Sequence, residues 1–93
     1  MAVEVLPFAM TSAAVDVATD TQAAVTITPS SEAYVVVQTS DDAGVTYTDA
    51  TTPALYRAEA TETLSDLAED TLVRAKFYGG IGTLSVDIVA STP

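Results

Sequence analysis

Few side chains in this 93-residue sequence could do chemistry, and their types exclude most catalytic mechanisms. Histidine and cysteine are absent, so neither a Ser-His-Asp nor a Cys-His arrangement can form. A Ser-Lys pair would need Lys76, the only lysine, but Arg74 and Lys76 share one face of a predicted strand, which favours a salt-bridge ladder. Paired carboxylates could hydrolyse glycosides, but thirteen acids form pairs by chance and tryptophan, the usual sugar platform, is absent. We therefore predict that the chain is not an enzyme.

Two pairs of adjacent acids, Asp41-Asp42 and Glu69-Asp70, have two interpretations. Carboxylate oxygens suit calcium, but the sequence has no D-x-D-x-D-G series. Adjacent acids at a predicted turn are more typical of solvated turn formers. The run Gly79-Gly80-Ile81-Gly82 is followed by neither Lys-Ser/Thr nor a helical pattern, so it predicts a hairpin turn rather than a phosphate-binding loop. We expect no cofactor and no metal.

The strongly acidic composition restricts the partners. The net charge is −10, from 13 acidic and 3 basic residues. Such a surface repels both nucleic acid and anionic membranes, so we predict neither as a partner. The three cations, Arg57, Arg74 and Lys76, are expected to pair with carboxylates. Because no signal-peptide pattern and no long apolar run is present, we expect synthesis in a cytoplasm.

Short runs rich in Thr and Val, broken by turn residues every 8–12 positions or so, predict an all-β domain. The expected fold is a small β-sandwich, Ig-like or jelly-roll-like, with about 7–8 antiparallel strands over residues 12–93. Six strands are predicted at 13–17, 23–28, 33–39, 45–48, 72–78 and 84–90. The continuous run Tyr34-Val35-Val36-Val37 indicates a strand that is buried on both faces.

Two hairpins are predicted. The first covers Tyr34–Thr48 and turns at 40–44, where Ser and Asp side chains can cap the backbone and Gly44 can supply a positive φ. The second covers Leu72–Ala90 and turns at Gly79-Gly80.

Residues 53–60 leave two alternatives open. Thr52 could cap a short helical turn that begins at Pro53, because Pro suits the first helical position and good helix formers follow. Alternatively, the segment is an extended loop anchored by Leu55 and Tyr56.

Residues 1–11 precede the regular strand pattern and are predicted to form an N-terminal arm. They carry a run of apolar side chains, namely Val3, Val5, Leu6, Phe8 and Met10. The arm could be a first strand that closes the edge of the sandwich, or it could pack on a neighbouring protein. Since aromatic residues make up only 6% of the chain, a Phe in the arm favours burial there. We therefore take these five residues as the predicted partner interface.

The segment Tyr34–Asp49 resembles a hairpin of small virion proteins of tailed bacteriophages, which carry the pattern V-x-L-Q-R-S-x-D-G-G-x-T-W. The ranges 67–76 and 80–88 are similar to two later parts of the same pattern. Two positions differ, since Thr39 stands where Arg is usual and Tyr47 stands where Trp is usual.

The resemblance implies a β-sandwich on a phage particle and brings no catalytic residues with it. The expected function is that of a capsid decoration (cement) protein on the outer capsid surface of the virion. Its expected partners are the major capsid protein and further copies of the chain, as a trimer or similar homo-oligomer. Two alternatives stay open: a tail or head–tail joining protein, and an Ig-like host-adhesion or carbohydrate-binding module with a platform built from Tyr34, Tyr47, Tyr56 or Tyr78.

Overall fold

The chain folds into antiparallel strands, as its alternating sequence predicts. A computed structural model describes the backbone of residues 3–6 and all of residues 11–91. In these ranges the strands are β1 (Val3–Leu6), β2 (Val15–Asp16), β3 (Gln22–Pro29), β4 (Glu32–Ser40), β5 (Thr48–Asp49), β6 (Ala54–Tyr56), β7 (Ala60–Leu64), β8 (Leu72–Ile81) and β9 (Leu84–Ser91). No helix able to cross a membrane occurs in this part of the chain. The predicted all-β class is confirmed.

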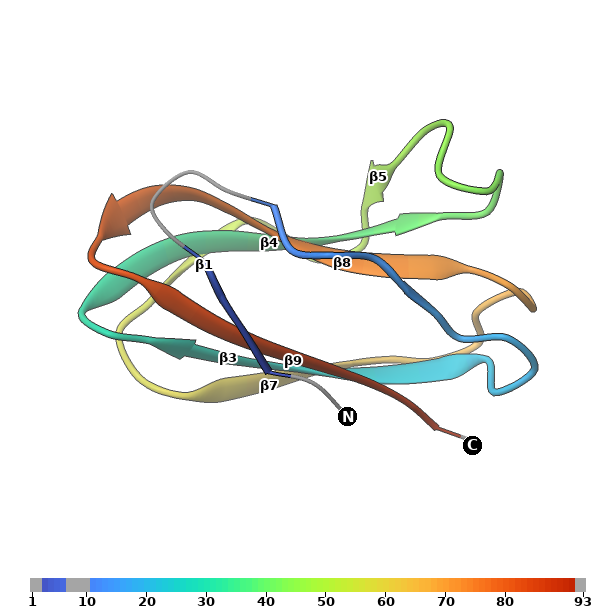
Figure 1. The fold of residues 1–93 in the computed structure, drawn as a ribbon, viewed down its shortest axis with the longest axis horizontal. Coiled ribbons are helices and arrows are strands. Elements are labelled where there is room, and N and C mark those ends of the chain that lie inside the picture. Colours follow the sequence, from blue (N-terminus) through green and yellow to red (C-terminus); the bar gives the residue numbers. More distant parts are fainter. Residues whose placement is uncertain (1–2, 7–10, 92–93) are drawn as a thin grey trace.

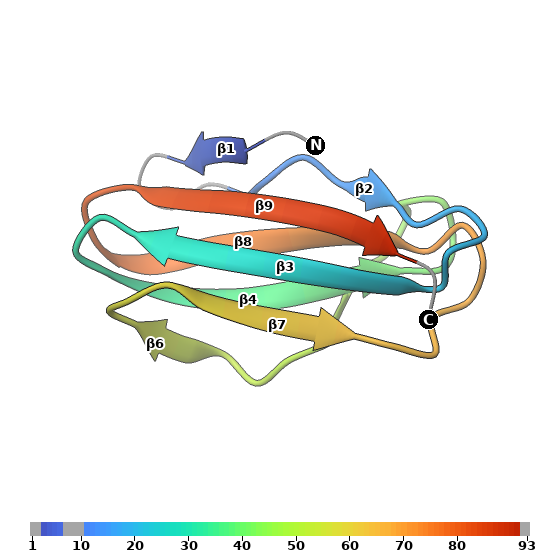
Figure 2. The same ribbon diagram turned by 90° about the horizontal axis from the view of Figure 1, so that it is seen from below.

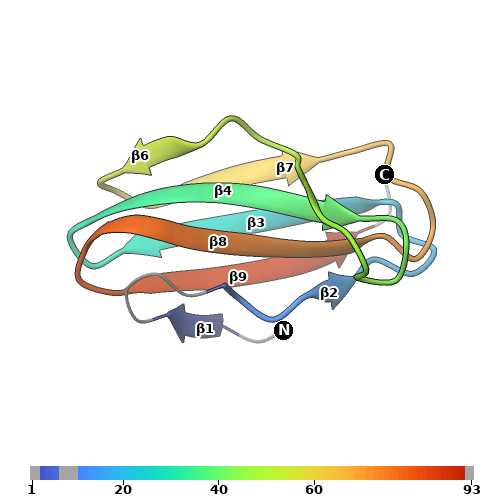
Figure 3. The same ribbon diagram turned by 90° about the horizontal axis from the view of Figure 1, so that it is seen from above.

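The strands form two layers, which Figure 1 shows edge-on. One sheet has four strands in the order β1-β9-β3-β7 and faces the viewer in Figure 2. The other has the order β2-β8-β4-β5, with β6 also paired to β4, and faces the viewer in Figure 3. This arrangement is the predicted small β-sandwich.

Two short turns carry the chain from one sheet to the other. Residues 30–31 connect β3 to β4, and residues 82–83 connect β8 to β9. The turns lie against each other: the Ser30 N–H donates to the Thr83 carbonyl at 2.9 Å, and the Thr83 N–H donates to Ser30 Oγ at 2.8 Å. Two strand–turn–strand arches therefore stack side by side, which pairs β3 with β9 and β4 with β8.

The core lies between the four long strands. Their inward positions alternate with outward ones, as expected for strands with one buried face. Phe77 is the largest fully buried side chain. The other buried members on these strands are Ala23, Val25, Ile27, Ala33, Val35, Val37, Val73, Ala75, Leu84, Val86 and Ile88. Val36 points to the opposite side and is still only 4% exposed, so the predicted burial of this strand on both faces is confirmed there, but it is wrong at Tyr34, which is 44% exposed on the same side.

The second predicted hairpin is wrong. Its strands exist, but β8 belongs to the five-stranded sheet and β9 to the four-stranded sheet. The turn lies at Gly82-Thr83 rather than at Gly79-Gly80. An arch and a hairpin share the same strand–turn–strand pattern, and here the contact with Ser30 selects the arch.

The first predicted hairpin forms, but the bounds predicted for its second strand are wrong. β4 pairs with β5 through Gln38↔Asp49 and Thr39↔Thr48. The predicted strand at 45–48 contributes only its last residue, because residues 41–47 form a loop that is held by its own side chains.

The helical turn considered for residues 53–60 does not form. Ala54–Tyr56 is instead the short strand β6, which pairs with Ala33–Val35 of β4. Tyr56 packs against the core and donates its hydroxyl hydrogen to Glu62 at 2.8 Å. Local helix propensity is a weak preference, and here the open edge of β4 and the burial of Tyr56 override it.

We expect Gly80→Ala to destabilise the fold by about 3 kcal/mol, because Gly80 combines a positive φ with a close backbone approach. Its φ is +124°, and an added Cβ would lie 2.3 Å from the Glu32 carbonyl oxygen. The matched control is Gly79→Ala, whose added Cβ would make an ordinary 3.4 Å contact with the Tyr34 ring and cost less than about 1 kcal/mol. Urea unfolding followed by circular dichroism measures both, and equal losses would contradict this role of Gly80.

Candidate functional site

The outer face of the five-stranded sheet carries apolar, polar and cationic side chains. β4 and β8 lie next to each other in this sheet, with Val36 opposite Lys76 and Gln38 opposite Arg74. Because the neighbouring residues point into the core, these four point outward. Two of the three cations of a chain with a net charge of −10 therefore share one face.

A groove of about 350 Å³ opens on this face. We call it the β4–β8 groove, and its lining residues are Val36, Gln38, Asp49, Pro53, Lys76 and Tyr78. The loop between β5 and β6 borders it, because this loop is fastened along the edge of β4. The Ala50 N–H donates to the Val37 carbonyl at 2.7 Å, and the Val37 N–H donates to Thr51 Oγ1 at 3.1 Å.

Hydrogen bonds fix the polar side chains at one end of the groove. Gln38 Nε2 donates to Asp49 Oδ1 at 3.1 Å, and Gln38 Oε1 accepts from Arg74 Nε at 2.9 Å. The Arg74 guanidinium carbon lies 3.6 Å from the centre of the Tyr47 ring, a cation–π contact. Arg74 is therefore held by an amide and a ring rather than by the carboxylate that the sequence predicted.

The four tyrosines have three different environments. Tyr34 and Tyr78 are 44% and 41% exposed, and their ring centres are 5.9 Å apart on the outer face of the five-stranded sheet. Tyr47 lies under Arg74. Tyr56 packs against the core, and its burial together with the hydrogen bond to Glu62 raises its pKa to about 12. An exposed aromatic pair is thus present, and it consists of Tyr34 and Tyr78.

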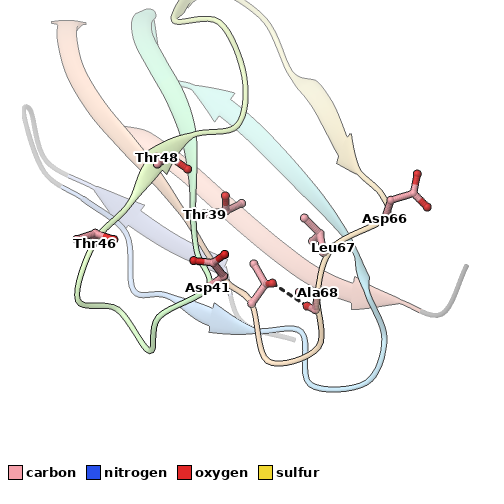
Figure 4. Close-up of a pocket in the computed structure, with 8 residues that line it drawn as sticks. Thr39, Asp41, Thr46, Thr48, Asp66, Leu67 and Ala68 are labelled. Atoms are coloured by element: carbon pink, nitrogen blue, oxygen red, sulfur yellow. Dashed lines mark hydrogen bonds between the residues drawn. The ribbon is translucent and has the colours of Figure 1, made fainter.

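A second, more polar pocket lies at the loop end of the sandwich, with a volume of about 290 Å³. Figure 4 shows it open between the loop that carries Asp41 and Thr46 and the loop that carries Asp66, Leu67 and Ala68. Thr71 Oγ1 donates to the Ala68 carbonyl at 2.7 Å and fastens the second loop. Within the described ranges, no three acidic side chains are placed to hold a metal ion together.

Asp42 is a turn former, as one of the two interpretations predicted. Its Oδ1 accepts from Ser40 Oγ at 2.6 Å and from the Thr46 N–H at 2.9 Å, while its Oδ2 accepts from Thr46 Oγ1. The hydrogen bond from Ser40 and those from Thr46 lower its pKa to about 2. Gly44 follows with a φ of +85°, as predicted for this turn.

The third cation lies away from the groove. Arg57 Nε is 3.2 Å from Glu32 Oε2, so this predicted carboxylate pair is present. The Arg57 side chain is 73% exposed and that of Glu32 35%, so solvent screens the pair and it contributes only about 0–1 kcal/mol.

The structure describes three of the five predicted interface residues, and only their backbone. Val3, Val5 and Leu6 belong to β1, which pairs with β9 at the edge of the four-stranded sheet. The backbone of these residues therefore forms a first strand at the edge of the sandwich, as one of the two alternatives for this segment predicted. Phe8 and Met10 lie outside the described residues. The interface role of all five stays a prediction.

The comparisons with known proteins add no relative. No family model matches the chain, and neither the curated proteins nor the solved structures searched contain a significant match.

We expect the stability supported by Asp42 to be lost in acid. The pKa of its carboxyl is lower in the folded chain, about 2, than its ordinary value of 3.8. The ionised form therefore stabilises the fold above about pH 4, and this contribution disappears as the pH falls toward 2. Asp42→Asn should melt at a lower temperature than the wild type at pH 6, and the two should converge near pH 2.

Thermal melts followed by circular dichroism across this pH range measure the difference. Asp41→Asn, at the neighbouring exposed acid, makes the same change in net charge and serves as the control. A constant difference between Asp42→Asn and the wild type at every pH would show that the ionised carboxylate does not hold the loop.

Proposed function

We propose that this chain is a non-enzymatic structural protein of a phage particle, a capsid decoration protein that binds the major capsid protein and bridges its subunits. The sequence resemblance over residues 34–90 suggests the class of particle. The observation that supports docking to the capsid through β1 is the free edge of this strand. A tail or head–tail joining protein could dock in the same way, and the position on the particle distinguishes these roles.

β1 is an edge strand with a single partner among the described strands. It pairs with β9 from Val3↔Asp87 to Leu6↔Leu84 and ends the strand order of its sheet. In an edge strand, alternate residues direct their N–H and C=O groups away from the sheet, where another strand can pair with them. A segment of a capsid subunit, or of a second copy of this chain, can extend the sheet in this way.

Such docking suits a small protein that acts in many copies. Each added strand contributes a few main-chain hydrogen bonds, worth about 1 kcal/mol each. Many weak contacts on a symmetric shell add up, because each bound copy raises the effective concentration of the others' sites. No catalytic group is required.

We expect a pair of proline variants, Glu4→Pro and Val5→Pro, to test this docking edge. In an antiparallel edge strand, one of two adjacent residues directs its N–H at the neighbouring strand and the other directs it outward. Proline removes the N–H, so one variant weakens the β1–β9 pairing while the other leaves the fold intact. The variant that keeps its melting temperature should still lose about tenfold or more in affinity for shells.

The measurement is co-sedimentation with purified particles stripped of this protein, followed by cryo-electron microscopy of the particles. Thr63→Pro, on β7 at the opposite edge of the same sheet, is the control. Shell binding by the fold-neutral variant at wild-type strength would refute docking through β1. Particles that carry no density for this chain on the outer shell would refute the decoration role, and density in the tail would assign the alternative.

A further inference from the structure

The β4–β8 groove has the construction of a ligand site. Its floor is the side chain of Val36, which is almost completely covered, and Pro53 and Tyr78 add apolar lining. The remaining lining side chains are polar and differ from one another: an amide, a carboxylate and an ammonium group, from Gln38, Asp49 and Lys76. A concave apolar surface with a few converging polar groups is typical of small-molecule sites.

The two exposed rings lie beside a β-bulge in β8. Tyr34 is opposite Gly79 and Val35 is opposite Phe77, so Tyr78 is the extra residue between these pairs. Phe77 remains fully buried while Tyr78 is turned to the surface, next to the ring of Tyr34. Bulges often re-aim a side chain at a functional site. Two large rings that contribute little to the core therefore stand side by side at the groove.

The groove escapes the strong negative charge of the chain. Its charged lining residues, Lys76 and Asp49, balance each other on a molecule whose net charge is −10, and Arg74 beside the groove adds one positive charge. Arg74 is occupied by Gln38 and by the Tyr47 ring, so Lys76 is the cation that lines the groove. The ligand that complements this arrangement carries a negative charge.

We propose that the β4–β8 groove binds an acidic oligosaccharide, a sugar chain that contains hexuronate residues. The C–H faces of pyranose rings stack on aromatic rings, and the Tyr34–Tyr78 pair provides two adjacent rings for them. Sugar hydroxyls can hydrogen-bond to the fixed Gln38–Asp49 pair, and the uronate carboxylate can pair with Lys76. The volume of about 350 Å³ suits one or two sugar rings.

An extended peptide fits the groove less well. At Lys76, β8 pairs with β4 on one side and is bridged by Thr11 on the other, so it offers no free edge for strand addition there. The proposal is independent of the docking edge, because β1 belongs to the other sheet.

The experiment titrates ¹⁵N-labelled protein with three probes: oligogalacturonate, oligoalginate and hyaluronan oligosaccharides. Each is compared with its carboxyl-reduced neutral counterpart. We expect at least one acidic probe to shift the amide signals of Gln38, Lys76 and Tyr78, and to bind about tenfold or more tightly than its neutral form. Tyr78→Ala and Lys76→Gln should each weaken this binding about tenfold. Thr61→Ala, on the other sheet, should not change it.

Lys76→Gln should also remove the preference for the acidic oligosaccharide over its neutral counterpart. A general loss of stability would weaken the binding of both and leave this preference unchanged. The proposal fails if no acidic probe binds at millimolar concentration, or if polyglutamate displaces a bound probe as well as the free sugar does. Tyr78→Ala and Lys76→Gln should bind shells as strongly as the wild type does. The test of oligosaccharide binding and the test of docking through β1 can therefore fail separately.

Discussion

The stacking of the two sheet-crossing turns is the constraint on which the rest of the structure depends. Each turn has two residues and crosses between the sheets, one from β3 to β4 and the other from β8 to β9. The hydrogen bonds between Ser30 and Thr83 hold the turns together and set the strand register beside them, with Pro29 opposite Leu84 in one sheet and Glu32 opposite Ile81 in the other. Because side chains alternate along a strand, this register decides which residues face the core.

The alternation of side chains along β8 lets adjacent residues serve the core and the surface. Phe77 fills the core between the sheets, and the next residue, Tyr78, is exposed on the outer face. Gly79 then lies opposite Tyr34, and because it has no side chain, the Tyr34 ring can lie over it and reach the Tyr78 ring. A side chain larger than that of alanine at position 79 would compete with Tyr34 for this space. The aromatic pair therefore depends on the absence of a large side chain at position 79.

The four long strands were predictable from the sequence, and most of their pairings were not. Alternation and β-branched residues are local signals, which is why Ala23–Thr28 and Ala33–Thr39 fall inside β3 and β4. Whether two such strands form a hairpin or an arch depends on contacts with a third segment, and Ser30, which decides the matter for β8 and β9, lies 53 residues from Thr83. The helical signal near Pro53 was also local, and pairing with β4 overrode it.

The candidate site was less predictable than the fold. The alternation Arg74-Lys76-Tyr78 on one face was visible in the sequence, and the structure keeps it. The other side of the groove comes from Gln38 and from the loop that Thr51 fastens to β4, and no periodic pattern links these residues to β8. The bulge itself leaves only a weak trace, a pair of glycines after Tyr78, which is equally typical of a turn.

The acidic composition gives a physical reason why an open edge can persist on so small a domain. A free edge strand invites pairing with any other strand, and natural sheets usually protect such edges with charge. Here the protection comes from the whole molecule, since two copies with a net charge of −10 each repel one another before their edges meet. A partner has to offset this repulsion with complementary contacts of its own. The charge that keeps β1 from pairing indiscriminately therefore also makes its pairing selective.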